Sequence, residues 1–111
     1  IAQGWGGDYN ACFLNRYDKF NDALGWHSDD SPGLDNDHPI AVISLGQERM
    51  IQWKPVKFKG AVPADWQTTL KDGSLFIMPR GFQQTHVHKI PRHSSQKCDT
   101  RISLTFRRFK V

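Results

Sequence analysis

The sequence predicts a mainly β protein, a barrel or jelly-roll sandwich with little helix. Short runs rich in β-branched and aromatic residues recur along the 111 residues, and Gly, Pro, Asn and Asp separate them. Helical periodicity is weak throughout. Many short strands between frequent turn signals are typical of barrels and jelly rolls. The length suits one domain that covers residues 1–111.

Each expected strand is a short apolar run bounded by turn residues. The stretch LGWHSDDSPG, residues 24–33, is expected to be a strand end that runs into a tight turn, and residues 18–24 to make one or two helical turns. Pro55 interrupts one strand, and Pro79 and Gly81 end a strand that we expect to be buried. Besides the strand end at residues 24–33, strands are expected at residues 11–17, 39–46, 49–58, 74–81, 83–91 and 101–109.

Charge and composition narrow the class of protein. Lys and Arg outnumber Asp and Glu by 15 to 11, which suits either a polyanionic partner or a solvated basic face. No apolar run is long enough to cross a bilayer, and no signal-peptide pattern is visible, so we expect a soluble protein without a membrane partner. Cys12 and Cys98 form no CxxC pair, so an intracellular setting is expected, cytoplasmic or, in a eukaryote, nuclear.

The pair His27 and Asp29 is a candidate metal site. Residues two apart share one face of a strand, so this spacing brings an imidazole and a carboxylate to one ion. His86 or His88 is the candidate third ligand, because two histidines and one carboxylate are the set that non-haem Fe(II) oxygenases prefer. The alternatives are a solvated histidine at each position and an Asp that only forms a turn.

Strict alternation marks the segment RISLTFR near the end of the chain. Arg101, Ser103, Thr105 and Arg107 share one face, and an apolar set on the other face is expected to be the core side. Two arginines on a polar strand face suit a small dicarboxylate, since a guanidinium matches a carboxylate with two parallel hydrogen bonds. A solvated arginine strand is the alternative.

Five blocks of sequence together resemble one family. The blocks NRY, GWHSDD, PIAVISLG, LKDGSLFIMPRGFQQTHVHKIP and RISLTFR resemble the AlkB-like 2-oxoglutarate and Fe(II)-dependent dioxygenases, from about Asn10 to Phe109. The resemblance implies a double-stranded β-helix, or jelly roll, with the metal at the open end of the barrel. It also implies Fe(II), 2-oxoglutarate and O2 as cofactor and co-substrates.

The resemblance assigns roles to individual residues. It implies that His27, Asp29 and His88 bind the iron, with His86 as second choice for the third ligand. The residues that resemble the family's 2-oxoglutarate pocket are Arg101 with Tyr17 at the distal carboxylate, Arg107 with Asn15 at the metal side, and Ser103 and Thr105 between them.

The function that the resemblance implies is oxidative demethylation of N-alkylated bases in DNA or RNA, with release of formaldehyde, succinate and CO2. The substrate is then a single-stranded or flipped base, and the protein a monomer. The candidate substrate contacts are Trp26, Asp30 and Ser31. Phosphates are expected to meet Lys54, Lys57, Lys59, Arg92 and Lys97, and the remaining aromatic candidates are Trp5, Trp53 and Trp66.

Two departures from the family pattern bear on the substrate. The N-terminal lid that reads the base is expected to be missing or truncated, and Ser31 stands where the family often has an acidic residue. Both departures weaken the inference of base repair more than the inference of oxygenase chemistry. The alternatives are the same chemistry on a protein or a small molecule, and a non-catalytic barrel that binds nucleic acid.

Overall fold

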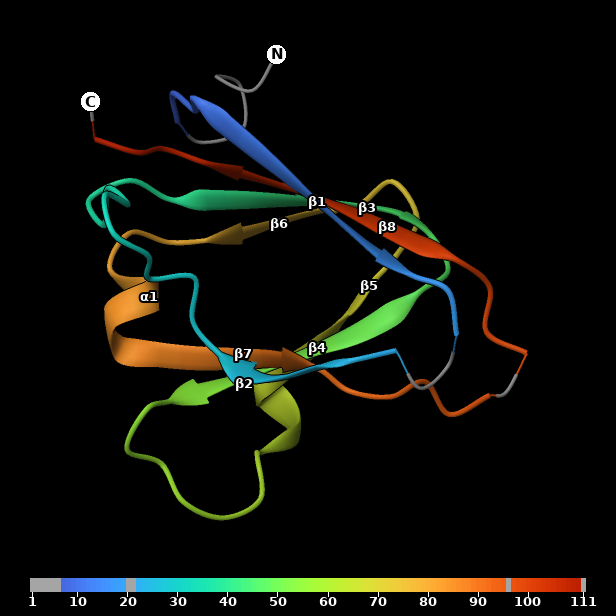
Figure 1. Cartoon of the computed structure of the whole chain (residues 1–111). Helices are drawn as coiled ribbons and strands as arrows, with labels where there is room; N and C mark the ends of the chain where they lie inside the picture. The colour runs from blue at the N-terminus through green and yellow to red at the C-terminus, as the bar shows by residue number, and fades with distance from the viewer. Residues whose placement is uncertain (1–6, 20–21, 96, 111) are drawn as a thin grey trace.

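The structure, a computed structural model, describes residues 7–19, 22–95 and 97–110, and within these ranges the mainly β prediction is confirmed. Two four-stranded antiparallel sheets face each other (Figure 1). The upper sheet has the order β1 (Ala11–Tyr17), β8 (Arg101–Arg107), β3 (Ile40–Gly46) and β6 (Leu75–Met78). The lower sheet has the order β2 (Leu24–His27), β7 (His86–Ile90), β4 (Arg49–Pro55) and β5 (Gln67–Leu70).

Helical structure in the described ranges is limited to one short α-helix and a single 3-10 turn. The α-helix, α1 (Phe82–Thr85), leads directly into β7, and the 3-10 turn, η2 (Ala64–Trp66), lies in the excursion between β4 and β5. No helix in the described ranges has both the length and the apolar character that a membrane span requires.

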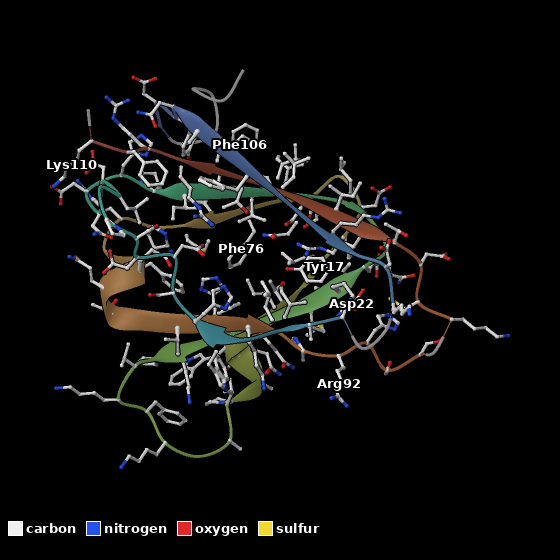
Figure 2. All side chains as sticks on the ribbon, viewed as in Figure 1. Tyr17, Asp22, Phe76, Arg92, Phe106 and Lys110 are labelled. Atoms are coloured by element: carbon white, nitrogen blue, oxygen red, sulfur yellow. The ribbon has the colours of Figure 1, made fainter. Side chains whose placement is uncertain are left out.

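The hydrophobic core lies between the two sheets in two clusters. Figure 2 shows Tyr17 and Phe76 in the space between the sheets. Phe76 packs against both clusters, and its ring lies 5.8 Å from that of Trp53. The buried members are Tyr17, Ile51, Leu70 and Ile90 in one cluster, and Leu34, Ile40, Val42 and Met78 in the other.

The faces of β8 are the reverse of the sequence prediction. Arg101, Ser103 and Thr105 are buried, whereas Leu104 and Phe106 on the apolar face are only half-buried. Figure 2 shows Phe106 near the outer side of the upper sheet. Alternation shows that the two faces of a strand differ but does not reveal which face points inward. Here the polar face points inward because it lines a cavity between the sheets.

Several element predictions need correction. The described residues between Asp18 and Leu24 form no helix, and Leu24 already belongs to β2; residues 20 and 21 lie outside the described ranges. The expected strand at 83–91 is shorter because its first residues form α1, and the strand at 49–58 ends at Pro55. The strand at 74–81 forms as β6, but Leu75 and Ile77 on it are exposed. The short polar strand β5 was not predicted.

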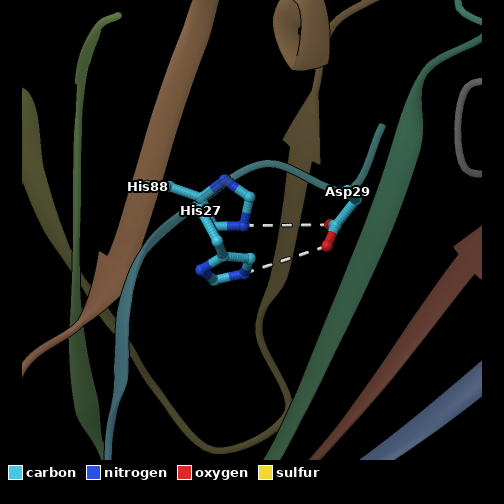
Figure 3. Close-up of side chains that lie close together, drawn as sticks. All are labelled: His27, Asp29 and His88. Atoms are coloured by element: carbon cyan, nitrogen blue, oxygen red, sulfur yellow. Dashed lines mark ion pairs between the residues drawn. The ribbon is translucent and has the colours of Figure 1, made fainter. Parts of the chain in front are cut away.

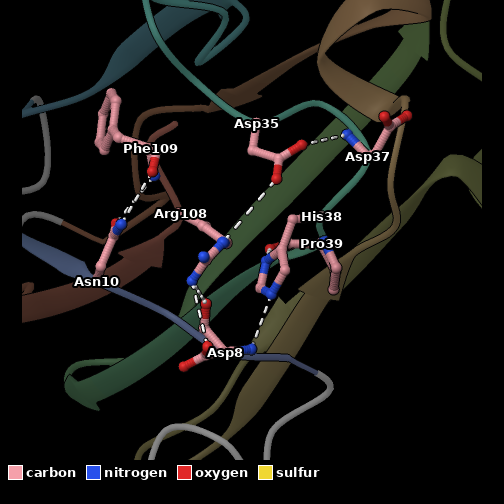
Figure 4. A network of polar contacts seen from close by, with 8 residues as sticks. All are labelled: Asp8, Asn10, Asp35, Asp37, His38, Pro39, Arg108 and Phe109. Atoms are coloured by element: carbon pink, nitrogen blue, oxygen red, sulfur yellow. Dashed lines mark hydrogen bonds and ion pairs between the residues drawn. The ribbon is translucent and has the colours of Figure 1, made fainter. Parts of the chain in front are cut away.

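The two ends of the described chain are tied together by polar contacts (Figure 4). Arg108 donates to the side chain and the carbonyl of Asp8 and lies within 4.0 Å of Asp35. The Asp8 main-chain N–H donates to His38 Nε2 at 2.8 Å. Asn10 exchanges two hydrogen bonds with the main chain of Phe109. These contacts fix β1 beside β8, the pair of strands that carries most of the polar cavity lining.

Candidate metal and co-substrate site

His27, Asp29 and His88 point toward one another in the lining of the cavity (Figure 3). The Nε2 atoms of the two histidines each lie 3.8 Å from a carboxylate oxygen of Asp29, and all three donor atoms lie within 4.8 Å of one another. A separation of 3.8 Å is too long for a hydrogen bond. It is short enough for one ion, since two metal–ligand bonds of about 2.1 Å reach across about 4.2 Å.

Two strands and a loop position these three groups. His27 is the last residue of β2 and pairs directly with His88 on β7, so the two imidazoles lie side by side with ring centroids 4.3 Å apart. Asp29 follows in the loop after β2, so the predicted placement of both residues on one strand face is wrong. The Pro32–Gly33 turn ends this loop: the Leu34 N–H donates to the Ser31 carbonyl at 3.0 Å, and Gly33 takes a φ of 84°.

Both histidines present Nε2 to the Asp29 carboxylate. The Nδ1–H of His27 donates to the Gly25 carbonyl at 2.7 Å, which leaves the lone pair on Nε2, the atom that faces Asp29. Burial lowers the pKa of His88 to about 4, while the nearby Asp29 charge opposes this. At neutral pH His88 is therefore an uncharged imidazole. These donors fit an Fe(II) ion of the two-histidine, one-carboxylate type.

Gln83 holds the loop that carries Asp29. This side chain is 6% exposed, and its Oε1 accepts a hydrogen bond from the Asp29 main-chain N–H at 2.8 Å. Its amide nitrogen lies 3.4 Å from the Met78 sulfur. Sequence reasoning missed Gln83, because 54 residues separate it from its partner and a lone Gln in a polar turn carries no visible signal.

Arg101 is a buried cation without a carboxylate partner among the described residues. It is 1% exposed, and one Nη donates to Ser44 Oγ at 3.0 Å, while Nε and the other Nη make no hydrogen bond. Its guanidinium lies over the Tyr17 ring at 5.0 Å. Burial lowers the pKa of Arg101, which reflects the cost of a charge removed from water. Such a group is stabilised by an anion in the cavity.

Arg107 lies at the other end of the polar face, beside the candidate metal ligands. Its Nη2 is 3.3 Å from Asp29 Oδ1, and its guanidinium lies over the Phe13 ring at 4.4 Å. The cavity between the sheets is lined by all six residues expected to hold 2-oxoglutarate and by the three candidate metal ligands: Asn15, Tyr17, Arg101, Ser103, Thr105, Arg107, His27, Asp29 and His88. Whether each residue binds as expected stays a prediction.

Arg49 is a second buried guanidinium that the sequence did not single out. It is 2% exposed at the start of β4 and lies over Tyr17 at 5.5 Å, so Tyr17 contacts the guanidiniums of both Arg49 and Arg101. One Arg49 Nη donates to the main-chain carbonyls of Asp22 and Pro91 at 2.6 and 2.8 Å. Arg49 therefore ties the start of β4 to the segment before β2 and to the segment after β7.

The remaining candidates lie elsewhere. His86, the second choice for a metal ligand, stacks on Phe82 with centroids 4.8 Å apart and is outside the metal-binding group. Ser31 Oγ donates to the Asp29 carbonyl, and Asp30 accepts from Asn36, so both act within the loop. Trp26 does not line the cavity. Trp5 lies outside the described residues.

Comparison with known proteins decides the family. The family model of the 2OG-Fe(II) oxygenase superfamily matches residues 3–107. The chain belongs to this superfamily. The superfamily uses Fe(II), 2-oxoglutarate and O2, in agreement with the donor set of the site. Within this superfamily it is AlkB-like, since AlkB-type proteins are among the relatives that it resembles.

Curated relatives include viral and cellular proteins. An RNA replication polyprotein of Citrus leaf blotch virus is 34% identical over 95% of this chain and 5% of its own length. The alpha-ketoglutarate-dependent dioxygenase alkB homolog 3 of Bos taurus is 31% identical over 96% of this chain and 39% of its own. The DNA oxidative demethylase ALKBH2 of Arabidopsis thaliana is 32% identical over 92% of this chain and 38% of its own length.

A solved structure, "The structure of OsALKBH1", is similar with a TM-score of 0.67 and 22% identity, over 91% of this chain and 48% of that one. This similarity confirms the jelly-roll fold. The chain spans less than half the length of each of these relatives.

Proposed function

We propose that this oxygenase domain demethylates N-alkylated bases in DNA or RNA, with release of formaldehyde, succinate and CO2. The observation that carries the proposal is the juxtaposition of two sites in one cavity. Three metal-type donors lie at one end, and further along lies Arg101, a buried guanidinium that has no carboxylate partner among the described residues. A metal site alone would not require the buried cation. Together they match a ligand that has an anionic end and a metal-binding end.

His27, Asp29 and His88 would hold Fe(II). When bound, this metal supplies the activation of O2, which is coupled to the decarboxylation of 2-oxoglutarate. The protein's own contribution is position and charge. The Gly25 carbonyl keeps the His27 lone pair directed toward the ion, and Gln83 keeps the Asp29 loop in place.

The co-substrate would lie along the polar face of β8. Arg101 would bind the distal carboxylate, assisted by the Tyr17 ring behind it, and the Ser103 and Thr105 hydroxyls would face the middle of the ligand. Arg107 with Asn15 would contact the carboxylate at the metal side, where Arg107 already offsets the Asp29 charge. Arg101, Ser103 and Thr105 are buried, which excludes water and strengthens the charge-assisted contact that Arg101 would make.

The substrate class rests on the relatives. Two of them are named as an AlkB-type dioxygenase and a DNA oxidative demethylase, and a third is a viral RNA replication polyprotein. An N-methyl base in a polynucleotide is the substrate consistent with the names of the two cellular relatives. DNA and RNA remain separate arms of the test.

The test uses single-stranded oligonucleotides that carry 1-methyladenine or 3-methylcytosine, as DNA and as RNA, with Fe(II), 2-oxoglutarate and O2. We expect formaldehyde and succinate in equal amounts from the methylated strands, and no formaldehyde from matched unmethylated strands. Succinate formation that no oligonucleotide stimulates, with no formaldehyde from either polymer, would contradict demethylation and favour a protein or small-molecule substrate.

A further inference from the structure

The outer face of the lower sheet carries an aromatic residue with two lysines against its ring. The Nζ atoms of Lys54 and Lys89 lie 4.6 and 4.9 Å from the centre of the Trp26 ring. The three residues come from β4, β7 and β2, which are neighbours in the sheet. We call this set the lysine–tryptophan surface.

This surface lies on the opposite side of the sheet from the site. Trp26 directly precedes His27, and Lys89 directly follows His88, so alternation along each strand sends the histidine into the cavity and its neighbour outward. His27 and His88 are cross-strand partners, which brings Trp26 and Lys89 together behind them. The strand that carries Trp26, β2, is the edge of its sheet.

The two ammonium groups have no anionic partner among the described residues. In the described part of the chain neither Lys54 nor Lys89 forms an ion pair, and β2, β7, β4 and β5 contain no Asp or Glu. Contact with the indole holds each lysine near one position, so less side-chain entropy is lost when it binds a ligand. Each ammonium keeps donors free for an oxyanion.

We propose that the lysine–tryptophan surface binds the phosphodiester backbone of a single-stranded polynucleotide, next to the base that enters the cavity. Charge complementarity decides the partner. The two lysines, which have no anionic partner in the described part of the chain, suit phosphate groups, and the indole beside them suits the neighbouring sugar or base. The proposal rests on the proposed function, because it supplies the polymer whose methylated base is the substrate. A strand held here reaches the cavity by passing around the edge strand β2.

The test is the salt dependence of binding, which needs no turnover, so failure of this proposal is distinguishable from failure of demethylation. Fluorescein-labelled 12-nucleotide oligo-dT and oligo-U are titrated with the full chain and followed by anisotropy at several salt concentrations. For Lys54→Ala with Lys89→Ala we expect affinity at least tenfold weaker at low salt, and a slope of log K against log salt about 1.4 shallower, because two phosphate contacts are lost.

Matched variants separate this surface from general charge effects. Lys71→Ala with Lys110→Ala also removes two exposed lysines, and Figure 2 shows Lys110 at the left, beside the upper sheet. This control is expected to change the slope by less than half as much. Trp26→Leu keeps both charges, so it should weaken binding about two- to fivefold with the slope unchanged. Unfolding midpoints show that each variant is folded.

Three results would overturn the proposal. The first is an equal loss of oligonucleotide affinity in both double variants, which would show that the effect depends on net charge alone. The second is an unchanged slope in Lys54→Ala with Lys89→Ala. The third is binding to vesicles with 30% phosphatidylserine that is lost in this variant while oligonucleotide binding is kept, which would make the surface a membrane contact.

Discussion

Gln83 Oε1 accepts a hydrogen bond from the main-chain N–H of Asp29 at 2.8 Å, across 54 residues of sequence. Gln83 lies in α1, directly before β7, the strand that carries His88. Its contact therefore links that strand to the loop that carries the Asp29 carboxylate. It makes the relative position of two candidate metal ligands depend on a residue that belongs neither to the metal-binding group nor to the cavity lining. The amide of Gln83 is buried, so water cannot easily replace it.

Gln83→Ala is therefore expected to weaken metal binding by roughly 10- to 100-fold, the usual effect of losing a group that orients a ligand. Titration calorimetry with Mn(II) and 2-oxoglutarate measures it. Gln84→Ala is the matched control, since Gln84 is exposed on the same turn. Equal metal affinities for the two variants would contradict a positioning role for Gln83.

Arg101→Lys should raise the KM for 2-oxoglutarate by about 10- to 150-fold, because the two parallel hydrogen bonds of the guanidinium to a carboxylate are lost. Lysine keeps the positive charge, so the effect reports geometry. Steady-state succinate formation measures KM and kcat separately. Arg80→Ala, at an exposed arginine, controls for general charge. A lower kcat with unchanged KM would show that Arg101 does not bind the co-substrate.

Arg49→Ala should lower the free energy of unfolding by about 1–3 kcal/mol, because two half-buried carbonyls lose their charged donor. Urea unfolding followed by tryptophan fluorescence measures this. Arg92→Ala is the control, as Figure 2 shows Arg92 extending outward from the molecule. If both variants unfold at the same urea concentration, Arg49 does not tie together the segments of Asp22 and Pro91.

His86→Ala should keep metal binding, whereas His88→Ala should lose it. His86 contacts Phe82 and Thr85, and only His88 faces Asp29. Metal content after dialysis against Fe(II) under nitrogen distinguishes the two variants. Loss of iron from His86→Ala together with its retention in His88→Ala would reverse the assignment of the third ligand.

The sequence revealed those features of the site that depend on short spacing. The pair His27 and Asp29, the THVH segment and the alternation of RISLTFR are each local, so the chemistry of their side chains is visible without a fold. Asp29 nevertheless reaches the site from a loop rather than from the strand, because β2 ends at His27.

The features that the sequence did not reveal depend on distant contacts. Gln83 and Arg49 find their partners 54, 27 and 42 residues away, and such pairings are decided by the packing of the two sheets. Alternation alone assigned the wrong face of β8 to the core for a related reason. A core usually selects apolar residues, but a cavity that holds a charged ligand selects the opposite.

The central claim is that Asp29 completes a metal site that supports 2-oxoglutarate turnover, and the most direct measurement is succinate formation by Asp29→Ala. The control is Asp37→Ala, which removes an exposed carboxylate from the same segment. With Fe(II), O2 and a 1-methyladenine oligonucleotide, we expect the control to match the unmodified chain and Asp29→Ala to form no succinate above the protein-free background. Equal succinate formation by the two variants would contradict the claim.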